Sequence, residues 1–123
     1  MRSRFTAFAT GDWPYLWRTL HPDHPDRTDS FENWSREAAA GSRALTFRAL
    51  KILDTAPADE GGHAHVLFAA QVLAGRRDVS FVEHSRFARS RDGWRYLDGR
   101  TLERVRVKMP LGELDFARFD GLR

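Results

Sequence analysis

The hydrophobic pattern changes its period close to Gly41, and this change constrains the fold more than any other feature of the chain. Upstream, apolar residues such as Trp13, Leu16 and Leu20 recur at helical spacing. Downstream, apolar and polar residues alternate as they do in half-buried strands. Helices followed by a meander of strands are typical of an α+β domain, so we expect N-terminal helices to cover one face of a curved antiparallel sheet.

Three helices are expected before the change of period. Asp12 can cap the second, and Pro14 lies in its first turn, where the missing N–H costs nothing. Pro22 disfavours helical geometry at the residue before it, and Gly41 is expected to stop the third helix. The expected helices cover residues 2–9, 13–20 and 28–40, the last starting at Thr28 or Asp29.

Antiparallel strands joined by turn-like segments are expected after the change of period. Asp92 and Gly93 form a typical hairpin signal, and Asp98 with Gly99 is expected to form a tight turn or a bulge. The expected strands cover residues 44–55, 64–73, 79–89, 94–97 and 102–108.

A chain of 123 residues is long enough for one domain with a single core. We expect an α+β domain over residues 1–109 and a C-terminal tail over 110–123, which packs back on the domain or orders only with a partner. The segment 64–73 is apolar on both faces, so its outer face needs a cover. A homodimer through the sheet and the tail of the same chain are the two alternatives.

Composition excludes several kinds of site. The absence of cysteine removes disulfides, thiol catalysis and thiolate metal ligands. The net charge of +3 comes from arginines interspersed with acids, which does not favour nucleic-acid binding. No apolar run reaches membrane-spanning length, and the first residues lack the apolar core of a secretion signal. We therefore expect a cytoplasmic protein without membrane contact, and no cofactor is indicated.

Glu83 is the strongest functional candidate. Strand alternation places it with Ser85 on the same face as Phe81 and Phe87, so that a carboxylate lies on an apolar surface. An unpaired buried charge is costly, and such a group is hydrogen-bonded, altered in pKa or placed in a pocket. The pocket interpretation makes Glu83 a ligand-binding group or a general acid or base. The structural interpretation pairs it with an arginine, for which Arg4 and Arg48 are the candidates.

Other polar residues are candidates to support Glu83 in the same cavity. Tyr15 and Tyr96 offer phenols, since buried tyrosines commonly have a polar partner, although both are equally explained as core residues. His21 follows a helix and either faces the cavity mouth or simply ends the helix. Arg4 completes the set of candidate ligand-binding residues, which is Glu83, Ser85, Tyr96, His21, Arg4 and Tyr15.

Neither metal binding nor nucleophilic catalysis by a serine is predicted. His63 and His65 share a strand face and could meet His84 on the next strand, but His63 borders a glycine turn, and we predict no metal site. Ser85 lacks the local sequence context of a hydrolase nucleophile.

Several segments, taken together, point to one family. They are Ser3-Arg4-Phe5-Thr6-Ala7-Phe8, Tyr15-Leu16, Thr19-Leu20-His21-Pro22, Leu50-Lys51-Ile52-Leu53-Asp54, Glu83-His84-Ser85-Arg86-Phe87 and Trp94-Arg95-Tyr96-Leu97-Asp98-Gly99. As a set, spanning roughly residues 2–100, they resemble the central domain of the YchJ family. The resemblance implies a nuclear transport factor 2-like cone, in which helices and a strongly bent sheet enclose a cavity.

The chain departs from that family in two respects. Family members commonly carry cysteine-rich, zinc-binding SEC-C segments, whereas this chain has no cysteine, so neither zinc nor the SecA-like contacts of such segments are carried over. Val82 stands where the family often has a histidine, whose role is therefore lost or taken by His84.

The function expected from the sequence is a small-ligand-binding or protein-interaction module with a polar group in an apolar cavity. An isomerase or hydrolase that uses Glu83 is the first alternative, and weak RNA or ribosome association is the second. A binding module ranks above an enzyme, because the sequence shows no second titratable group held against Glu83. The sequence does not identify the ligand.

Overall fold

The computed structural model describes residues 1–123 except the side chain of Thr28. The N-terminal helices are α1 (Arg2–Thr10), α2 (Trp13–Arg18) and α3 (Phe31–Ser42), with the short 3-10 helix η1 (Pro25–Thr28) before α3. As predicted, the side chain of Asp12 caps α2 by accepting from the amide of Tyr15 at 3.2 Å.

The third helix differs from the prediction at both ends. It begins at Phe31 rather than at residue 28 or 29, because the hydroxyl of Ser30 accepts from the amide of Asn33 and caps it there. Gly41 does not stop the helix, which continues to Ser42. A glycine ends a helix by adopting a left-handed conformation, and the chain uses that conformation at Gly11 but not at Gly41.

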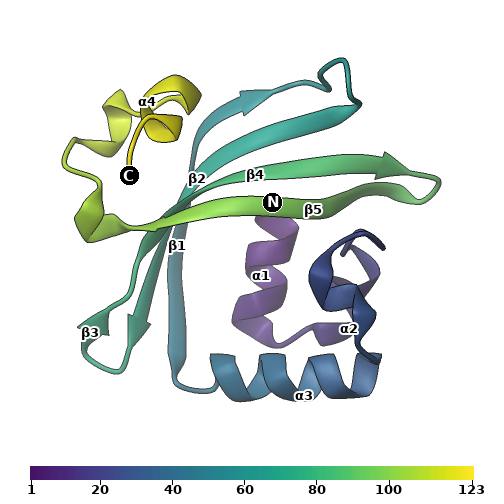
Figure 1. Ribbon diagram of the computed structural model, residues 1–123. Coiled ribbons are helices and arrows are strands. Elements are labelled where there is room, and N and C mark those ends of the chain that lie inside the picture. Colours follow the sequence, from purple (N-terminus) through teal and green to yellow (C-terminus); the bar gives the residue numbers. More distant parts are fainter.

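In the described part of the chain the strands form one five-stranded antiparallel sheet (Figure 1). The order is β1-β2-β4-β5, and the short strand β3 pairs with β2. The strands are β1 (Leu45–Ala56), β2 (His63–Ala74), β3 (Arg77–Asp78), β4 (Phe81–Ser90) and β5 (Gly93–Glu103). The α+β class and the order of helices before strands are confirmed.

The expected strong curvature of the sheet is wrong, because the strands twist without curling into a cone (Figure 1). Curling needs irregularities that follow one another across neighbouring strands. Here the register shifts lie in the outer pairs, β1 with β2 and β4 with β5, while the central pairing of β2 with β4 keeps a continuous register.

The last strand is also more continuous than predicted. Asp98 and Gly99 remain in the ladder, opposite Arg86 and Ser85, instead of forming a turn. The irregularity lies just before them, between the pairs Arg86–Asp98 and Phe87–Tyr96. Residues 104–106, predicted as strand, form the 3-10 helix η2 (Arg104–Arg106).

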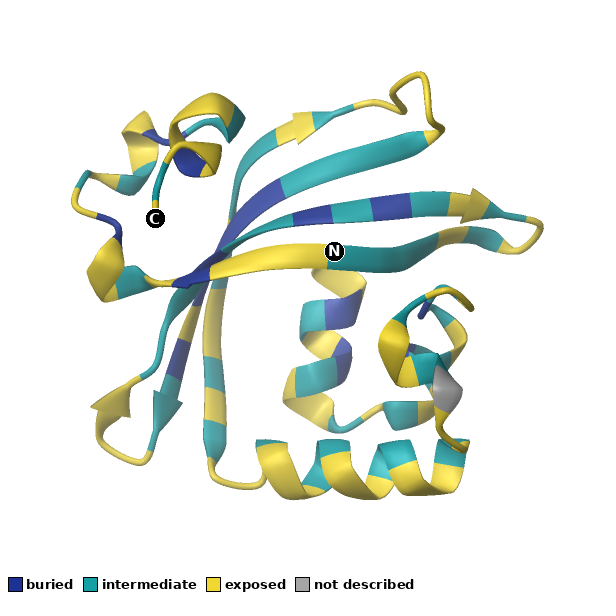
Figure 2. Ribbon diagram, viewed as in Figure 1, coloured by how far each residue is buried: buried dark blue, intermediate teal, exposed yellow. Residues whose placement is uncertain are grey.

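Hydrophobic residues of the sheet pack on both of its faces. Figure 2 shows buried positions in the central strands, in α1 and in the C-terminal segment. On one face, Phe68, Ala70 and Val72 of β2 pack with the side chain of Phe5 from α1. On the other face lies the larger cluster, built by sheet residues and the C-terminal segment. Its buried members are Leu67, Ala69, Val82, Leu102, Val107, Leu114 and Phe119.

The C-terminal segment packs against the sheet, which is the first of the two alternatives expected for residues 110–123. It contains η3 (Leu111–Glu113) and α4 (Phe116–Asp120), and Phe119 of α4 is completely buried. Arg100 of β5 also donates from Nη1 to the carbonyl of Phe119 at 3.0 Å. Residues 110–123 therefore form part of the domain core and cover the outer face of β2.

Across the described residues, every helix is too short or too polar to cross a membrane.

Candidate functional site

A cluster of polar side chains lies on the helix-covered face of β4 and β5. The antiparallel register places Glu83 opposite Thr101 and Ser85 opposite Gly99. Tyr96 lies further along β5, and its backbone also pairs with residues after α2: its amide donates to the carbonyl of Thr19 at 2.7 Å, and its carbonyl accepts from the amide of His21 at 2.8 Å. These bonds fix the end of α2 beside the cluster.

Three hydroxyl groups donate hydrogen bonds to the carboxylate of Glu83. Tyr96 and Ser85 both donate to Oε2, the former at 2.8 Å, and Thr101 donates to Oε1 at 2.8 Å. Ser85 is completely buried. A carboxylate offers about four acceptor positions, so most of the capacity of Glu83 is already used. The charge is thus stabilised by neutral donors.

Glu83 is not paired with any arginine that the structure describes, contrary to the structural interpretation of this residue. Within the described chain, Glu83 forms no ion pair with an arginine, and Arg48 is exposed on β1. Arg4 lies nearby, over the face of the Tyr96 ring, with its Cζ 4.9 Å from the ring centroid. Tyr96 therefore contacts both groups, Arg4 through its ring and Glu83 through its hydroxyl.

Gly99 allows the cluster to form, and its role was not recognised from the sequence. A Cβ atom at this position would lie 2.5 Å from Glu83 Oε2 and 2.6 Å from the Tyr96 hydroxyl. These distances are shorter than van der Waals contact, so any side chain at position 99 would push the two groups apart. The sequence Asp98-Gly99 is typical of a turn, so the need for a glycine beside Glu83 and Tyr96 was not apparent from it.

Tyr96 stays protonated and acts as a donor. Burial raises the pKa of its phenol, and the negative charge of Glu83 raises it further. The hydroxyl therefore keeps its proton at any physiological pH and donates it to Glu83.

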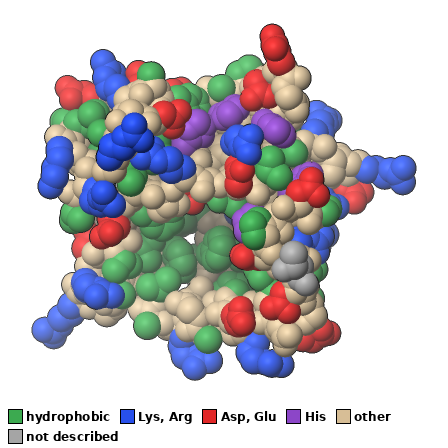
Figure 3. Space-filling model, in the orientation of Figure 1, with side chains coloured by type: hydrophobic (Ala, Val, Ile, Leu, Met, Phe, Trp, Pro, Cys, Tyr) green, Lys and Arg blue, Asp and Glu red, His purple; other side chains and the backbone are tan. Residues whose placement is uncertain are grey.

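A cavity of about 400 Å³ lies between the sheet and the N-terminal helices, and Figure 3 shows it as a hollow with hydrophobic walls. Glu83, Tyr96 and Arg4 border it, together with His24. Its apolar wall is mainly aromatic and includes Phe5, Phe8, Trp34, Phe47, Phe68 and Phe81. A mostly apolar hollow with a few convergent polar groups has the size and character of a small-molecule site.

The predicted site residues are therefore only partly brought together. Glu83, Tyr96 and Arg4 border the cavity, and Ser85 supports Glu83 from behind. The ring of His21 accepts from the amide of Asp23 at 3.0 Å, and Tyr15 donates to Ser3 at 2.6 Å, so both are engaged elsewhere. His24, which was not among the predicted site residues, has its ring 5.7 Å from that of Tyr96. It lies in an irregular loop, where no periodic pattern predicts which way a side chain points.

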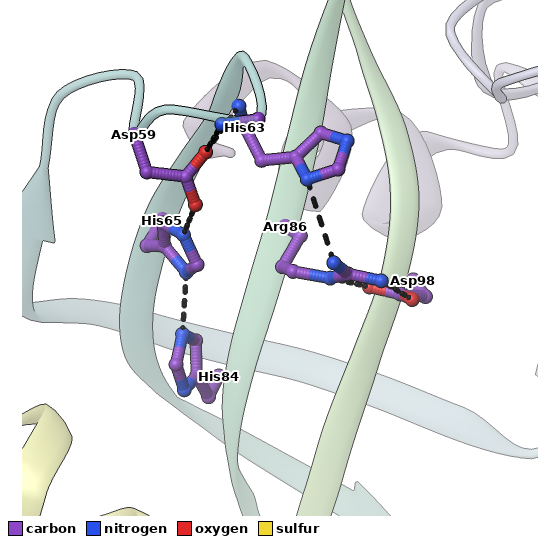
Figure 4. A network of polar contacts seen from close by, with 7 residues as sticks. Asp59, His63, His65, His84, Arg86 and Asp98 are labelled. Atoms are coloured by element: carbon purple, nitrogen blue, oxygen red, sulfur yellow. Dashed lines mark hydrogen bonds and ion pairs between the residues drawn. The ribbon is translucent and has the colours of Figure 1, made fainter.

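A second polar cluster lies on the opposite face of the sheet and reaches α4 through Asp120. Figure 4 shows its other members, Asp59, His65 and His84. His65 Nε2 lies 2.8 Å from Asp59 Oδ2, and His65 Nδ1 lies 2.9 Å from His84 Nε2. His84 Nδ1 lies 2.8 Å from Asp120 Oδ1 of α4. This chain of four residues, which we call the histidine chain, connects the β1–β2 turn to the C-terminal helix.

Of the three histidines considered for metal binding, His65 and His84 are in contact, but His63 is engaged elsewhere. His63 lies 3.4 Å from Arg86 Nη1, and Arg86 in turn pairs with Asp98, as Figure 4 shows. Among the described residues, no group of three or more histidine, cysteine, aspartate or glutamate side chains is arranged to hold a metal ion.

Because of Asp59, the free energy of unfolding of the domain is expected to fall as the pH is lowered into the acid range. The hydrogen bond from His65, followed by that from the amide of His63, lowers the pKa of Asp59 from 3.8 to about 2. A lowered carboxyl pKa stabilises the fold above pH 3.8, and this contribution is lost as the pH falls towards 2. We expect Asp59→Asn to flatten the fall in unfolding free energy across this interval, measured by urea denaturation at several pH values. Glu60→Gln, at the exposed neighbour, should leave the slope unchanged; equal slopes for Asp59→Asn and the wild type would contradict the prediction.

The architecture and the cavity define a class before any relative is considered: an α+β domain in which N-terminal helices and an antiparallel sheet border a hollow. Comparison with known families makes the class more specific, since residues 1–99 match the YchJ middle NTF2-like (nuclear transport factor 2-like) domain. The chain belongs to the YchJ family, also called UPF0225.

Three relatives illustrate the match. A UPF0225 protein of Sodalis glossinidius is 35% identical over 102 residues, covering 81% of this chain and 63% of the relative. A UPF0225 protein of Streptomyces coelicolor is 36% identical over 104 residues, covering 84% and 73%. The solution structure of a SEC-C motif containing protein from Rhodopseudomonas palustris superposes with a TM-score of 0.68 at 27% identity, covering 84% of this chain and 76% of that one.

The chain thus spans less than two thirds of the length of the Sodalis relative. It contains no cysteine with which to build the zinc-binding SEC-C segment of its family.

Proposed function

We propose that this domain binds a small, largely apolar molecule that carries one polar group. The cavity of about 400 Å³ beside Glu83, Tyr96 and Arg4 is the observation that carries the proposal. Protein interiors are normally packed without large voids, because unfilled apolar space forfeits dispersion contacts. A hollow lined with aromatic rings is therefore better explained by a ligand than by the needs of folding.

Binding is favoured over catalysis by the geometry around Glu83. A general base needs a free lone pair for the proton that it accepts. Three hydroxyl donors already occupy most of the acceptor positions of the Glu83 carboxylate, and Tyr96 holds its own proton firmly. The cluster is therefore better suited to orient a ligand than to exchange protons with it.

The proposal is tested by blocking the cavity. Ser42 lines it from the end of α3, whereas the neighbouring Gly41 is exposed and has open space around it. We expect the wild type to bind 2-naphthalenemethanol, a neutral aromatic probe, with NMR shifts confined to cavity residues. Ser42→Phe should weaken binding by about tenfold or more, equivalent to about 1.4 kcal/mol, since the new ring occupies the hollow.

Gly41→Phe is the matched control, because it adds the same ring to the same helix on the solvent side. It should leave the affinity within about twofold of the wild type, a difference well below 1 kcal/mol. Equal binding by all three proteins would show that the probe binds outside the cavity and would refute the proposal.

A further inference from the structure

Arg4 is a buried cation that has no acidic partner in the described chain. Its side chain lies on α1 and is 6% exposed. None of the carboxylates of the described residues lies within ion-pair distance of its guanidinium. Burial lowers the pKa of Arg4 to about 10, which shows the cost of holding this charge away from water. A charge so placed is commonly balanced by a partner of opposite sign.

More than half of the hydrogen-bonding capacity of Arg4 is unused. A guanidinium has five N–H donors, and Nη1 uses its two on the carbonyl of Leu16, at 3.1 Å, and the hydroxyl of Thr19. Nε and Nη2 donate no hydrogen bond to any described residue. Because Arg4 borders the cavity, a ligand in the hollow can reach these donors. Planar carboxylates match them with two parallel bonds.

Glu83 borders the same cavity, and its negative charge attracts Arg4 without forming an ion pair with it. Its carboxylate already accepts hydrogen bonds from the hydroxyls of Ser85, Tyr96 and Thr101, so few of its acceptor positions are open. The open hydrogen-bonding groups at the cavity wall are therefore mainly the donors of Arg4. An ammonium group would meet a nearly saturated acceptor and repulsion from Arg4, whereas a carboxylate would meet three unused donors, which offset its repulsion from Glu83.

We infer that the ligand of this cavity is a compact aromatic monocarboxylate, whose carboxylate pairs with Arg4 and whose ring lies among the aromatic side chains of the wall. Paired rings such as Phe8 and Phe47, stacked with centroids 6.0 Å apart, and Phe68 and Phe81, at 6.1 Å, provide flat and edge-on surfaces for such a ring. The inference rests on the proposed function and specifies the polar group that it left open.

Three probes of the same shape test the sign of the charge: 2-naphthoate, 2-naphthalenemethanol and 2-naphthalenemethylammonium. By NMR titration of the wild type at pH 7, 2-naphthoate should bind about tenfold more tightly than the alcohol, as one charge-assisted hydrogen-bonded pair allows. The ammonium probe should bind most weakly.

Arg4→Gln should remove the advantage of 2-naphthoate and leave the affinity for the alcohol within about threefold, since the apolar wall is untouched. Arg4 also links α1 to α2, so Thr19→Val serves as a structural control that deletes one of those bonds and keeps the charge. It should retain the preference for 2-naphthoate.

The outcomes separate the two proposals. If 2-naphthoate binds no better than the alcohol, or if the ammonium probe binds best, the carboxylate inference is overturned while ligand binding stands. If no probe binds, the proposed function itself is overturned. Should Arg4→Gln fail to fold, the ranking of the three probes on the wild type still decides.

Discussion

Replacing Phe119 by alanine is expected to lower the free energy of unfolding by about 3–5 kcal/mol, the usual cost of deleting a buried phenyl ring. Phe119 lies in α4, close to the C-terminus, and none of its surface is exposed. Its ring fills the cluster formed with Leu67 and Val82 of the sheet, so its loss leaves a cavity in the larger core. Urea denaturation followed by tryptophan fluorescence measures the effect.

Val105→Ala is the control, because Val105 is 68% exposed and its truncation should change stability by no more than about 0.5 kcal/mol. A loss below about 1 kcal/mol for Phe119→Ala would mean that the C-terminal segment is not part of the core. Light scattering on the wild type and on Phe119→Ala tests the alternative of a homodimer formed through the sheet. We expect a monomeric wild type and a self-associating Phe119→Ala protein, because a loosened α4 uncovers the apolar sheet face.

Gly99→Ala is expected to cost about 1–3 kcal/mol, as overpacking commonly does. The new methyl group would lie 2.5 Å from Glu83 Oε2 and 2.6 Å from the Tyr96 hydroxyl, so it must separate the donor from the acceptor. A partly buried carboxylate that loses a hydrogen bond adds its own desolvation penalty. Thermal unfolding measures the loss, and the Tyr96 ring resonances report the displacement.

Gly41→Ala is the matched control for this glycine. Gly41 lies in α3 with open space around it, so alanine there should stabilise the domain by up to about 1 kcal/mol. The two substitutions should therefore have opposite signs. If Gly99→Ala were as stable as the wild type, the close packing of Glu83 and Tyr96 would not be required.

Local pattern was sufficient to predict the order of elements and the direction of Glu83. Both depend on short-range periodicity: the helical spacing of Trp13 and Leu16, and the alternation that turns Glu83 towards the helices. The partners of Glu83 depend instead on cross-strand register. Thr101 could not be found, because the sequence indicated a break at Asp98 and Gly99 where β5 continues. Register depends on pairing with another strand, which no local signal specifies.

The same limit applies to the rest of the site. Arg4 was recognised as a candidate, but its approach to Tyr96 depends on how α1 packs against the end of α2. His24 lies in a loop without periodicity, and the packing of residues 110–123 depends on contacts with strands far away in the sequence. Interactions between distant segments are set by the whole fold, which is why the cavity emerged only from the structure.

The histidine chain joins segments that are far apart in the sequence. Asp59 lies in the turn before β2 and Asp120 lies in α4, and the rings of His65 and His84 bridge them side chain to side chain. Such a relay is complete only when the turn and the C-terminal helix are both in place. A disturbance at α4 should therefore be transmitted across the sheet to the loop that precedes β2.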